Sequence, residues 1–425
     1  MLEVAVAFLA FLVLLALGMP VAFALLASTL AGLLLVGDVP LQIVAQTAYS
    51  PSVSFLLLAI PFFILTADLL TSGKLGAQVI SLASSLLGRF RGGLGQASVA
   101  TSVVFSGVSG SAVADASGLG SVLIPWTKRE GYPAPYAAAV NASSSILGVL
   151  LPPSIPLILY ASVSGVSVAA LFLAGIVPGL LLAAALLLVC WFVARRGGYP
   201  VVREPLDWRK VLKGVLLSLP LVLAPIVLIR VLLFGGVATV TEVSVLAALY
   251  AVLLRVVVYR DLTLSGLARS AVNSAAATGV VMFLIMASSA LGWFITVQEV
   301  PQQLSSMLLG SITAGVVILL LMNLLMLFVG AFLDMSPAIL LLTPVLLPIA
   351  AGIGLDPVQL GVIMVLNLGI GLFTPPVGTT LYISTSIARI RIEQTVRALL
   401  PFYLASSLVL IAVTYVPQIS LALVG

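Results

Sequence analysis

The chain has 425 residues, of which 62% are hydrophobic and only 7% are charged, with a formal net charge of +5. A soluble domain carries about 25% charged residues, so this composition excludes an ordinary soluble enzyme and predicts a membrane protein with an apolar exterior. The chain has no histidine and a single cysteine, Cys190, which excludes disulfides within the chain and metal sites built from His or Cys.

Long apolar runs recur along the chain, most of them about 18–25 residues long and able to cross roughly 30 Å of hydrocarbon. We predict ten crossings, at residues 3–18, 20–36, 49–72, 135–165, 168–194, 214–233, 237–254, 272–297, 358–387 and 401–424. The N-terminus has neither a basic region nor a small-residue cleavage site. We therefore expect two crossings separated near Pro20 rather than a cleaved signal peptide.

Two further apolar segments, 92–128 and 312–350, are interrupted in the middle by Gly, Ser, Asp or Pro. A broken apolar segment can enter the bilayer and return on the same side if its tip is buried in protein or lines a watery cavity. We interpret both as re-entrant helical hairpins, with plain kinked crossings as the alternative.

The two halves of the chain match at a constant offset of 223 residues. Paired Gly and Pro fix backbone geometry and carry more weight than apolar matches. The fold class is therefore predicted as an all-α polytopic membrane protein with two inverted repeats, 1–194 and 214–425, joined by a cytoplasmic linker at 195–213. The matching residues are Phe105 and Phe328, Gly107 and Gly330, Pro125 and Pro348, Gly131 and Gly354, Gly148 and Gly371, and Pro152-Pro153 and Pro375-Pro376.

The basic residues indicate the orientation. With the N-terminus outside and only the ten crossings traversing, every Lys and Arg except Arg230 lies on the cytoplasmic side, as the positive-inside rule requires. Both termini are then periplasmic, the first hairpin opens inward and the second opens outward. Because the basic residues lie in short loops, the net charge gives no reason to expect binding of nucleic acid.

Each half contains a crossing broken by a proline pair, opposite a hairpin tip. Prolines have no N–H group, so carbonyls ahead of each pair lose their helical donors, and in hydrocarbon an unpaired carbonyl costs several kcal/mol. We predict that Na⁺ binds these oxygens, some through the backbone, as in other secondary transporters. The alternative is close helix packing at Gly and Ser with simple proline kinks. The first predicted cluster is Ser106, Ser109, Gly148, Leu151 and Pro152, and the second is Gly330, Gly371, Thr374 and Val377.

Polar residues in otherwise apolar segments are candidates for substrate binding. Glu242 lies near a predicted helix start, where a capping role is expected. No Lys or Arg lies at the predicted midplane, so an anionic substrate would depend on helix termini and bound cations for its counter-charge. The substrate candidates are Ser111, Asp115, Asn141, Asp334, Asn367 and Thr379.

Two motifs point away from catalysis. Residues 107–110 read GVSG, but a serine nucleophile needs a base, and no histidine or nearby lysine is available. The chain also has no G-x-x-x-x-G-K-[ST] loop for ATP hydrolysis. We therefore predict that the chain is not an enzyme and has no cofactor other than coupling Na⁺.

The segments FSGVSGSAVADASGLG and SSSILGVLLPPSIP, and in the second half GAFLDMSPAILLLTPVLLPIA and NLGIGLFTPPVGTTLY, resemble the large membrane subunit of tripartite ATP-independent periplasmic (TRAP) transporters over essentially the whole chain. One departure is Val240, which stands where this family usually has proline.

The resemblance implies a small four-helix membrane subunit, a periplasmic substrate-binding protein, and elevator-type, Na⁺-coupled uptake of a carboxylate such as a C4-dicarboxylate or a sialic acid across the inner membrane. The positions it implies for Na⁺ are the two clusters named above. The alternatives are a stand-alone Na⁺/carboxylate symporter, a non-transporting subunit of a membrane complex, and a channel.

Overall fold

The computed structural model describes residues 2–37, 39–71, 74–90, 92–201, 208–225, 235–311 and 314–424, and these residues form helices and loops without strands. The helices of the first half are α1 Leu2–Ala16, α2 Val21–Val36, α3 Gln42–Tyr49, α4 Ala59–Thr71, α5 Lys74–Leu87, α6 Gly93–Ser109, α7 Ala112–Gly118, α8 Gly120–Arg129, α9 Ala134–Ser144, α10 Leu147–Leu150, α11 Ile155–Ser164 and α12 Val168–Gly197. Two short 3₁₀ helices, η1 Ser50–Val53 and η2 Leu56–Leu58, precede α4.

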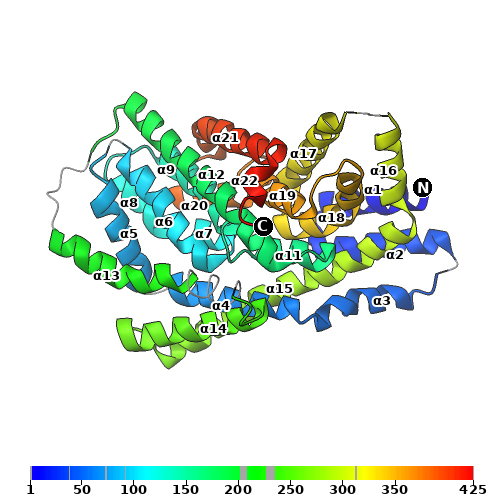
Figure 1. The fold of residues 1–425 in the computed structure, drawn as a ribbon, viewed down its shortest axis with the longest axis horizontal. Helices are drawn as coiled ribbons and strands as arrows, with labels where there is room; N and C mark the ends of the chain where they lie inside the picture. The colour runs from blue at the N-terminus through cyan, green and yellow to red at the C-terminus, as the bar shows by residue number, and fades with distance from the viewer. Residues whose placement is uncertain are drawn as a thin grey trace.

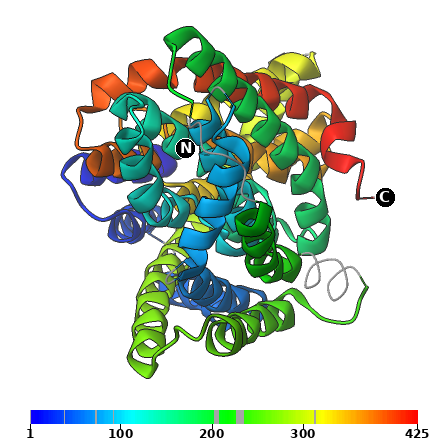
Figure 2. The ribbon, with the colours of Figure 1, turned by 90° about the vertical axis from the view of Figure 1, so that its left-hand side faces the viewer.

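The helices of the second half are α13 Trp208–Pro225, α14 Val240–Leu253, α15 Leu264–Val297, α16 Val300–Ser311, α17 Gly315–Phe332, α18 Met335–Gly352, α19 Pro357–Leu372, α20 Thr379–Ala388, α21 Ile392–Tyr415 and α22 Pro417–Leu421. A π-helix, η4 Leu254–Tyr259, continues α14. In Figure 1, α3, α4 and α14 lie along one long margin with α15 beside them, and α17 and α21 lie along the other. Figure 2 shows the molecule turned by 90°.

Helix starts recur in the two halves at the offset of 223 residues found in the sequence. The starts of α6 and α17, of α7 and α18, of α9 and α19, and of α11 and α20 agree within one residue at that offset. Both predicted hairpins are pairs of helices joined at a short tip: α6 with α7 and α8, and α17 with α18. The first tip turns at Gly110, which has a left-handed φ of 59°, and the second at Leu333 and Asp334, which are extended.

Six of the described helices are long and apolar enough to cross a membrane, and two bent pairs would raise that number to eight. The predicted crossings 3–18 and 20–36 form α1 and α2, which are shorter apolar helices of 15 and 16 residues. The predicted crossing 49–72 covers η1, η2 and α4, and the chain bends by 59° between α3 with η1 and η2 with α4. Residues 226–233 of the predicted crossing 214–233 lie outside the described residues, as do residues 202–207 of the linker.

The centre of the molecule is formed by the helices that precede the two proline pairs. Every residue of α10 is buried, as is every residue of α19 from Gln359 to Leu372. Helices α12, α20 and α21 pack around α9 and α19. In contrast, α1 and α2 carry exposed apolar side chains such as Phe8 and Leu34, which are 62% and 67% exposed. An apolar outer surface around a buried core is the arrangement expected in lipid.

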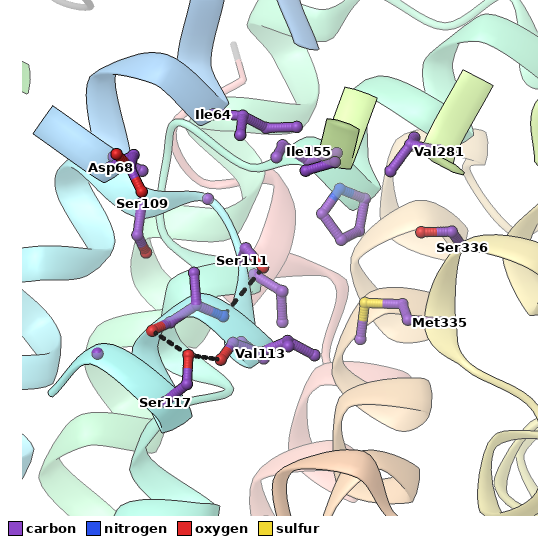
Figure 3. Close-up of a pocket in the computed structure, with 18 of the residues that line it drawn as sticks. Ile64, Asp68, Ser109, Ser111, Val113, Ser117, Ile155, Val281, Met335 and Ser336 are labelled. Atoms are coloured by element: carbon purple, nitrogen blue, oxygen red, sulfur yellow. Dashed lines mark hydrogen bonds between the residues drawn. The ribbon is translucent and has the colours of Figure 1, made fainter. Parts of the chain in front are cut away.

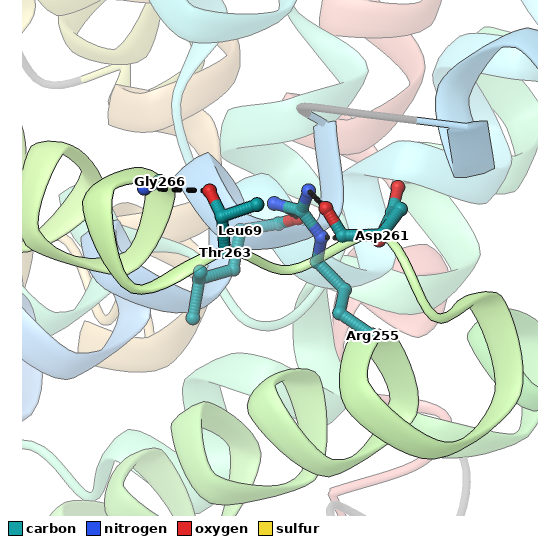
Figure 4. Close-up of polar contacts among 5 residues, drawn as sticks. All are labelled: Leu69, Arg255, Asp261, Thr263 and Gly266. Carbon is teal, nitrogen blue, oxygen red and sulfur yellow. Dashed lines mark hydrogen bonds and ion pairs between the residues drawn. The ribbon is translucent and has the colours of Figure 1, made fainter.

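Two sets of polar interactions hold the two ends of the helix formed by α14 and its π-helical extension. Thr239 and Glu242 form a capping box, in which the Thr239 N–H donates to Glu242 Oε2 at 2.7 Å, as predicted for Glu242. At the other end, Arg255 is buried, and its Nε lies 3.0 Å from Asp261 Oδ1. Arg255 Nη1 also donates to the Leu69 carbonyl of α4 at 3.2 Å (Figure 4). The guanidinium therefore ties the end of α14 to the end of α4.

Candidate functional site

Both predicted broken helices end at their proline pairs. The first passes from α10, which ends at Leu150, to α11, which begins at Ile155, and the axis bends by 44°. The second passes from α19, which ends at Leu372, to α20, which begins at Thr379. The peptide bond between the two prolines is cis in both pairs.

The first proline pair removes the helical donors of two carbonyls. A helical carbonyl accepts from the N–H four residues on, and for Gly148 and Val149 those residues are Pro152 and Pro153. The Val149 carbonyl accepts instead from the Ser154 hydroxyl. Within the described part of the chain, no donor takes the place of Pro152 at the Gly148 carbonyl, which leaves that oxygen available to a ligand.

At the second proline pair, both carbonyls that lose a helical donor find another one, from Thr374 in the loop or from Thr380 at the start of α20. The Leu372 carbonyl accepts from Thr380 Oγ1 at 2.9 Å, and the Gly371 carbonyl accepts from the Thr374 N–H at 2.9 Å. The two breaks therefore share their sequence position but differ in how their carbonyls are satisfied.

Each broken helix is hydrogen-bonded to the hairpin tip of its own half. The Ile155 N–H donates to the Gly110 carbonyl at 3.3 Å, and the Val377 N–H donates to the Ala331 carbonyl at 3.1 Å. The hairpin tips and the proline breaks, which the sequence places far apart, are therefore in contact in both halves.

The first predicted cluster gathers around Gly148. A Cβ built on Gly148 would lie 3.2 Å from Ser109 Oγ and closer still to Asp115 Oδ2. Ser109 and Asp115 are each 1% exposed. The Ser109 hydroxyl interacts with the Asp115 carboxylate, and neither group has another hydrogen-bond partner among the described residues. Ser106 is also buried, but its hydroxyl donates to the Val103 carbonyl at 2.6 Å.

Leu151 and Pro152 are buried in the same break. The cluster thus joins a carboxylate, a hydroxyl and a carbonyl whose helical donor is missing. These are the oxygen ligands that hard cations prefer. No group of three or more His, Cys, Asp or Glu that could hold a metal ion occurs among the residues described.

The second predicted cluster is built on a direct contact between two glycines. A Cβ on Gly371 would lie 2.5 Å from the backbone carbon and oxygen of Gly330, so α17 and α19 approach each other at the backbone. The Thr374 hydroxyl donates to the Ile370 carbonyl at 2.7 Å, and Val377 is 44% exposed. The four predicted residues lie in one region, and the nearby carboxylate is that of Asp334, which lines an open cavity together with Val377.

A cavity of about 580 Å³ lies between the hairpin tips and the pair of helices α4 and α15. Figure 3 shows its lining. Ser109 and Ser111 come from the first tip, and Asp334 and Ser336 from the second. A second, open cavity of about 550 Å³ is lined by Asp334 and Thr379 together with Val377. The two cavities meet at Asp334, which lines both.

The predicted substrate residues separate into two groups. Ser111, Asp334 and Thr379 line one of the cavities, and Ser111 also caps α7 by accepting from the Ala114 N–H at 3.3 Å. Asp115 lies beside Gly148 and Ser109 of the first predicted cluster instead, outside the residues that line the two cavities.

The two predicted asparagines hold helices together. Asn141 Nδ2 donates to the Ala116 carbonyl and to Ser384 Oγ, both at 2.9 Å. Asn367 Nδ2 donates to the carbonyl and to the side-chain oxygen of Asn323, also both at 2.9 Å. Both asparagines are buried and lie away from the cavity linings.

Asp68 of α4 and Asn273 of α15 also line the larger cavity and were not predicted. Both are polar residues inside predicted crossings, the same signal that selected Asn141 and Asn367. Among the described residues that line this cavity, the charged ones are Asp68 and Asp334, and none is Lys or Arg. The cavity therefore has acidic groups and no basic group to meet an anion.

The sequence is similar to those of transport proteins along almost its whole length. The family model described as "Tripartite ATP-independent periplasmic transporter, DctM component" matches residues 8–419. "Uncharacterized protein y4mL" of Sinorhizobium fredii is 50% identical, with 97% of this chain and 98% of that protein covered. "Sialic acid TRAP transporter large permease protein SiaM" of Vibrio cholerae is 38% identical, with 96% and 95% covered.

A longer relative and a solved structure extend the comparison. "Isethionate TRAP transporter permease protein DctMQ" of Oleidesulfovibrio alaskensis is 35% identical, and the match covers 98% of this chain but 65% of that protein. The YdaH transporter of Alcanivorax borkumensis superposes with a TM-score of 0.62 over 92% of this chain and 90% of its own, at 16% sequence identity. At that identity the likeness concerns the fold alone.

Proposed function

This chain belongs to the family of the DctM component of tripartite ATP-independent periplasmic transporters, and we propose that it is a large permease subunit that takes up an organic acid coupled to Na⁺. The family is one of multi-pass inner-membrane permeases, so the chain is assigned transport rather than catalysis. The resemblance to TRAP large subunits expected from the sequence motifs is confirmed by the family match and by relatives such as SiaM.

The observation that carries the Na⁺ proposal is the group of buried oxygens at Gly148. Ser109 Oγ and both Asp115 oxygens are buried with no described hydrogen-bond partner beyond each other, beside a carbonyl whose helical donor would be Pro152. Buried polar groups left unpaired are costly, and a cation bound there would satisfy them together. The second site is assigned to Gly330, Gly371, Thr374 and Val377 by its equivalent position in the second half.

The larger cavity is assigned to the substrate. It is lined by both hairpin tips, so a carboxylate in it would lie close to both proposed Na⁺ sites. Bound Na⁺ would supply the positive charge that the described lining lacks. A C4-dicarboxylate, a sialic acid or a related carboxylate is the proposed substrate class, and one relative is described as a sialic acid transporter.

We assign the movement to an elevator mechanism in a fold of two inverted repeats. Helix starts that recur at 223 residues support two related halves, and the distribution of Lys and Arg supports periplasmic termini. In this mechanism the hairpins and broken helices would slide together against α1–α4, α14 and α15. The substrate cavity lies between those two groups of helices, where such a movement would open it to either side.

The proposed partners are a small four-helix membrane subunit and a periplasmic substrate-binding protein, in a lipid bilayer. The relative called DctMQ, of which this chain covers 65%, agrees with a small subunit that works beside this one. Apolar side chains exposed on α1, α2 and α14 provide surface for lipid or for such a subunit.

The test is uptake into proteoliposomes. The chain is reconstituted with its small partner, and a panel of carboxylates is offered with and without binding protein and an inward Na⁺ gradient. Uptake that needs both Na⁺ and the binding protein is the expected result. Na⁺-driven uptake by this chain alone would instead establish a stand-alone Na⁺/carboxylate symporter, and accumulation without any ion gradient would refute the proposal.

A further inference from the structure

One wall of the larger cavity is formed by single faces of two helices that carry neither of the proposed Na⁺ sites. On α4 the lining residues are Ile64, Ala67, Asp68 and Thr71, whose spacing of three and four places them on one face. On α15 the lining face includes Asn273 and Ser274. This wall faces the hairpin tips, so a substrate between them meets Asp68 and Asn273 on one side.

The polar side chains of this wall differ in whether they already make hydrogen bonds within the protein. Ser274 Oγ donates to the Ser270 carbonyl at 2.7 Å. Within the described chain, the side chains of Asp68 and Asn273 make no hydrogen bond, and Asp68 makes no ion pair. Asp68 is half-buried, and an acceptor-only carboxylate in that position calls for a donor from the ligand.

The cavity lies beside the first proposed Na⁺ cluster, because Ser109 belongs to that cluster and also lines the cavity. Ser109 is 1% exposed, and among the described residues its hydroxyl has no partner other than the Asp115 carboxylate. In the view of Figure 3, Asp68 and Ser109 lie toward one end of the cavity, and Met335 and Ser336 lie toward the other. Met335 and Ser336 begin α18, and Asp334, its cap residue, lines the cavity beside them.

The two ends therefore suit different chemical groups. Both ends carry one acid, Asp334 at the start of α18 and Asp68 on α4. The α18 end also has backbone N–H groups, a helix dipole and the nearby second proposed Na⁺ site, which offset the charge of a carboxylate there. The Asp68 end offers a carboxylate, and a second carboxylate placed there would face like charge with no Lys or Arg in the lining to offset it. A hydroxyl or ammonium group would instead donate to Asp68.

We propose that Asp68 is a specificity-determining residue that accepts a hydrogen bond from a hydroxyl or ammonium group at the far end of the substrate, so that hydroxy acids or amino acids are taken in preference to dicarboxylates. This inference rests on the proposed function and narrows its substrate class. Hydroxyl and ammonium groups share the ability to donate a hydrogen bond to Asp68. The ligands of the test distinguish a hydroxyl donor from an ammonium donor.

The experiment measures binding of matched ligands to the full-length chain in nanodiscs by calorimetry, in NaCl and in choline chloride. Succinate, 4-hydroxybutyrate and 4-aminobutyrate share four carbons and one carboxylate and differ at the other end. Glucarate and gluconate form a longer pair with the same difference. In at least one set, the acid that ends in a hydroxyl or ammonium group is expected to bind at least about tenfold more tightly than the dicarboxylate in NaCl. Asp68→Asn is expected to bring this ratio of dissociation constants close to one, because the amide can also donate to a carboxylate.

Asp356→Asn is the matched control, because Asp356 is an exposed cap of α19 outside the cavity lining and asparagine also caps helices. It is expected to leave the ratio unchanged. A wild-type preference for the dicarboxylates, or an Asp68→Asn ratio equal to that of wild type, would overturn the inference and leave Na⁺-coupled carboxylate transport standing.

Two further outcomes are decisive. If Asp68→Asn abolishes the Na⁺-dependent rise in melting temperature while keeping the ligand ratio, Asp68 belongs to a cation site and the inference fails. If none of these acids binds in NaCl, this inference fails, and if a wider carboxylate panel is also inactive, the proposed function fails as well.

Discussion

At the scale of single residues, substitution of Gly148 tests the cation proposal most directly. A methyl group at Gly148 would fill the space beside Asp115 and Ser109, so Gly148→Ala would displace an ion bound there. We expect Na⁺-driven uptake to fall by about tenfold or more, equivalent to about 1.4 kcal/mol of lost binding. Uptake at saturating and limiting Na⁺ measures the effect.

Gly292→Ala is the control for this substitution. Gly292 lies in α15, and a Cβ there meets nothing within 4 Å. Alanine in a helix interior is more favourable than glycine by about 0.5–1 kcal/mol, so this variant should keep full uptake and melt at the same or a slightly higher temperature. Equal uptake by the two variants would show that the space at Gly148 holds no ion.

Asp115 gives a second prediction at this scale. Binding of an ion to the folded state raises stability, by about 2.7 kcal/mol when its concentration is 100 times Kd. Asp115→Asn keeps the size of the side chain but removes its charge, so the rise in melting temperature between choline chloride and NaCl should shrink or disappear. A variant that kept the full Na⁺-dependent shift would remove Asp115 from the cation site, whereas Asp356→Asn should keep it.

At the scale of helices, the contact between α17 and α19 depends on the absence of side chains. Gly371→Ala would bring a Cβ to 2.5 Å from the Gly330 backbone, and overpacking of this kind costs about 1–3 kcal/mol. We expect a lower melting temperature in both NaCl and choline chloride. Gly310→Ala in α16, where a Cβ meets nothing within 4 Å, should not lower it, and equal melting of the two variants would contradict the close contact.

The contact that Arg255 makes between the end of α14 and the end of α4 leads to a second prediction at the scale of helices. The side chains of Arg255 and Asp261 are 9% and 10% exposed, and removal of one partner of a buried ion pair costs about 3 kcal/mol or more. Asp261→Ala should therefore lower the melting temperature clearly. Glu130→Ala, at an exposed position, should change stability by no more than about 0.5 kcal/mol. Similar melting of both variants would mean that the tie contributes little.

At the scale of the whole molecule, much of the architecture follows from patterns along the chain. Composition predicts an all-helical membrane protein, and helices begin at Gly93, Ala112, Gly315 and Met335 inside the segments predicted as hairpins. Proline pairs mark the broken helices because their effect on hydrogen bonding is local. The number of crossings, the inverted topology and the Na⁺ ligands stay predictions.

The remainder depends on contacts between distant segments. Helices α5 and α16 lie in segments predicted as loops, because hydropathy selects apolar runs and does not detect short helices of mixed polarity. Asp115 cannot be assigned to the Gly148 cluster, nor Asp68 to the cavity wall, until α7, α10 and α4 are packed together. Arg255, assigned to a loop from its charge, is buried because Asp261 and the Leu69 carbonyl meet it.

The most direct test of the central claim is the steady-state accumulation ratio of a transported carboxylate measured against the size of the imposed Na⁺ gradient. The full transporter is reconstituted in proteoliposomes with the membrane potential held at zero. Na⁺ coupling predicts that the ratio rises with the gradient, at least in proportion to it, and that Gly148→Ala flattens the dependence. An accumulation ratio that does not change with the Na⁺ gradient would contradict the account.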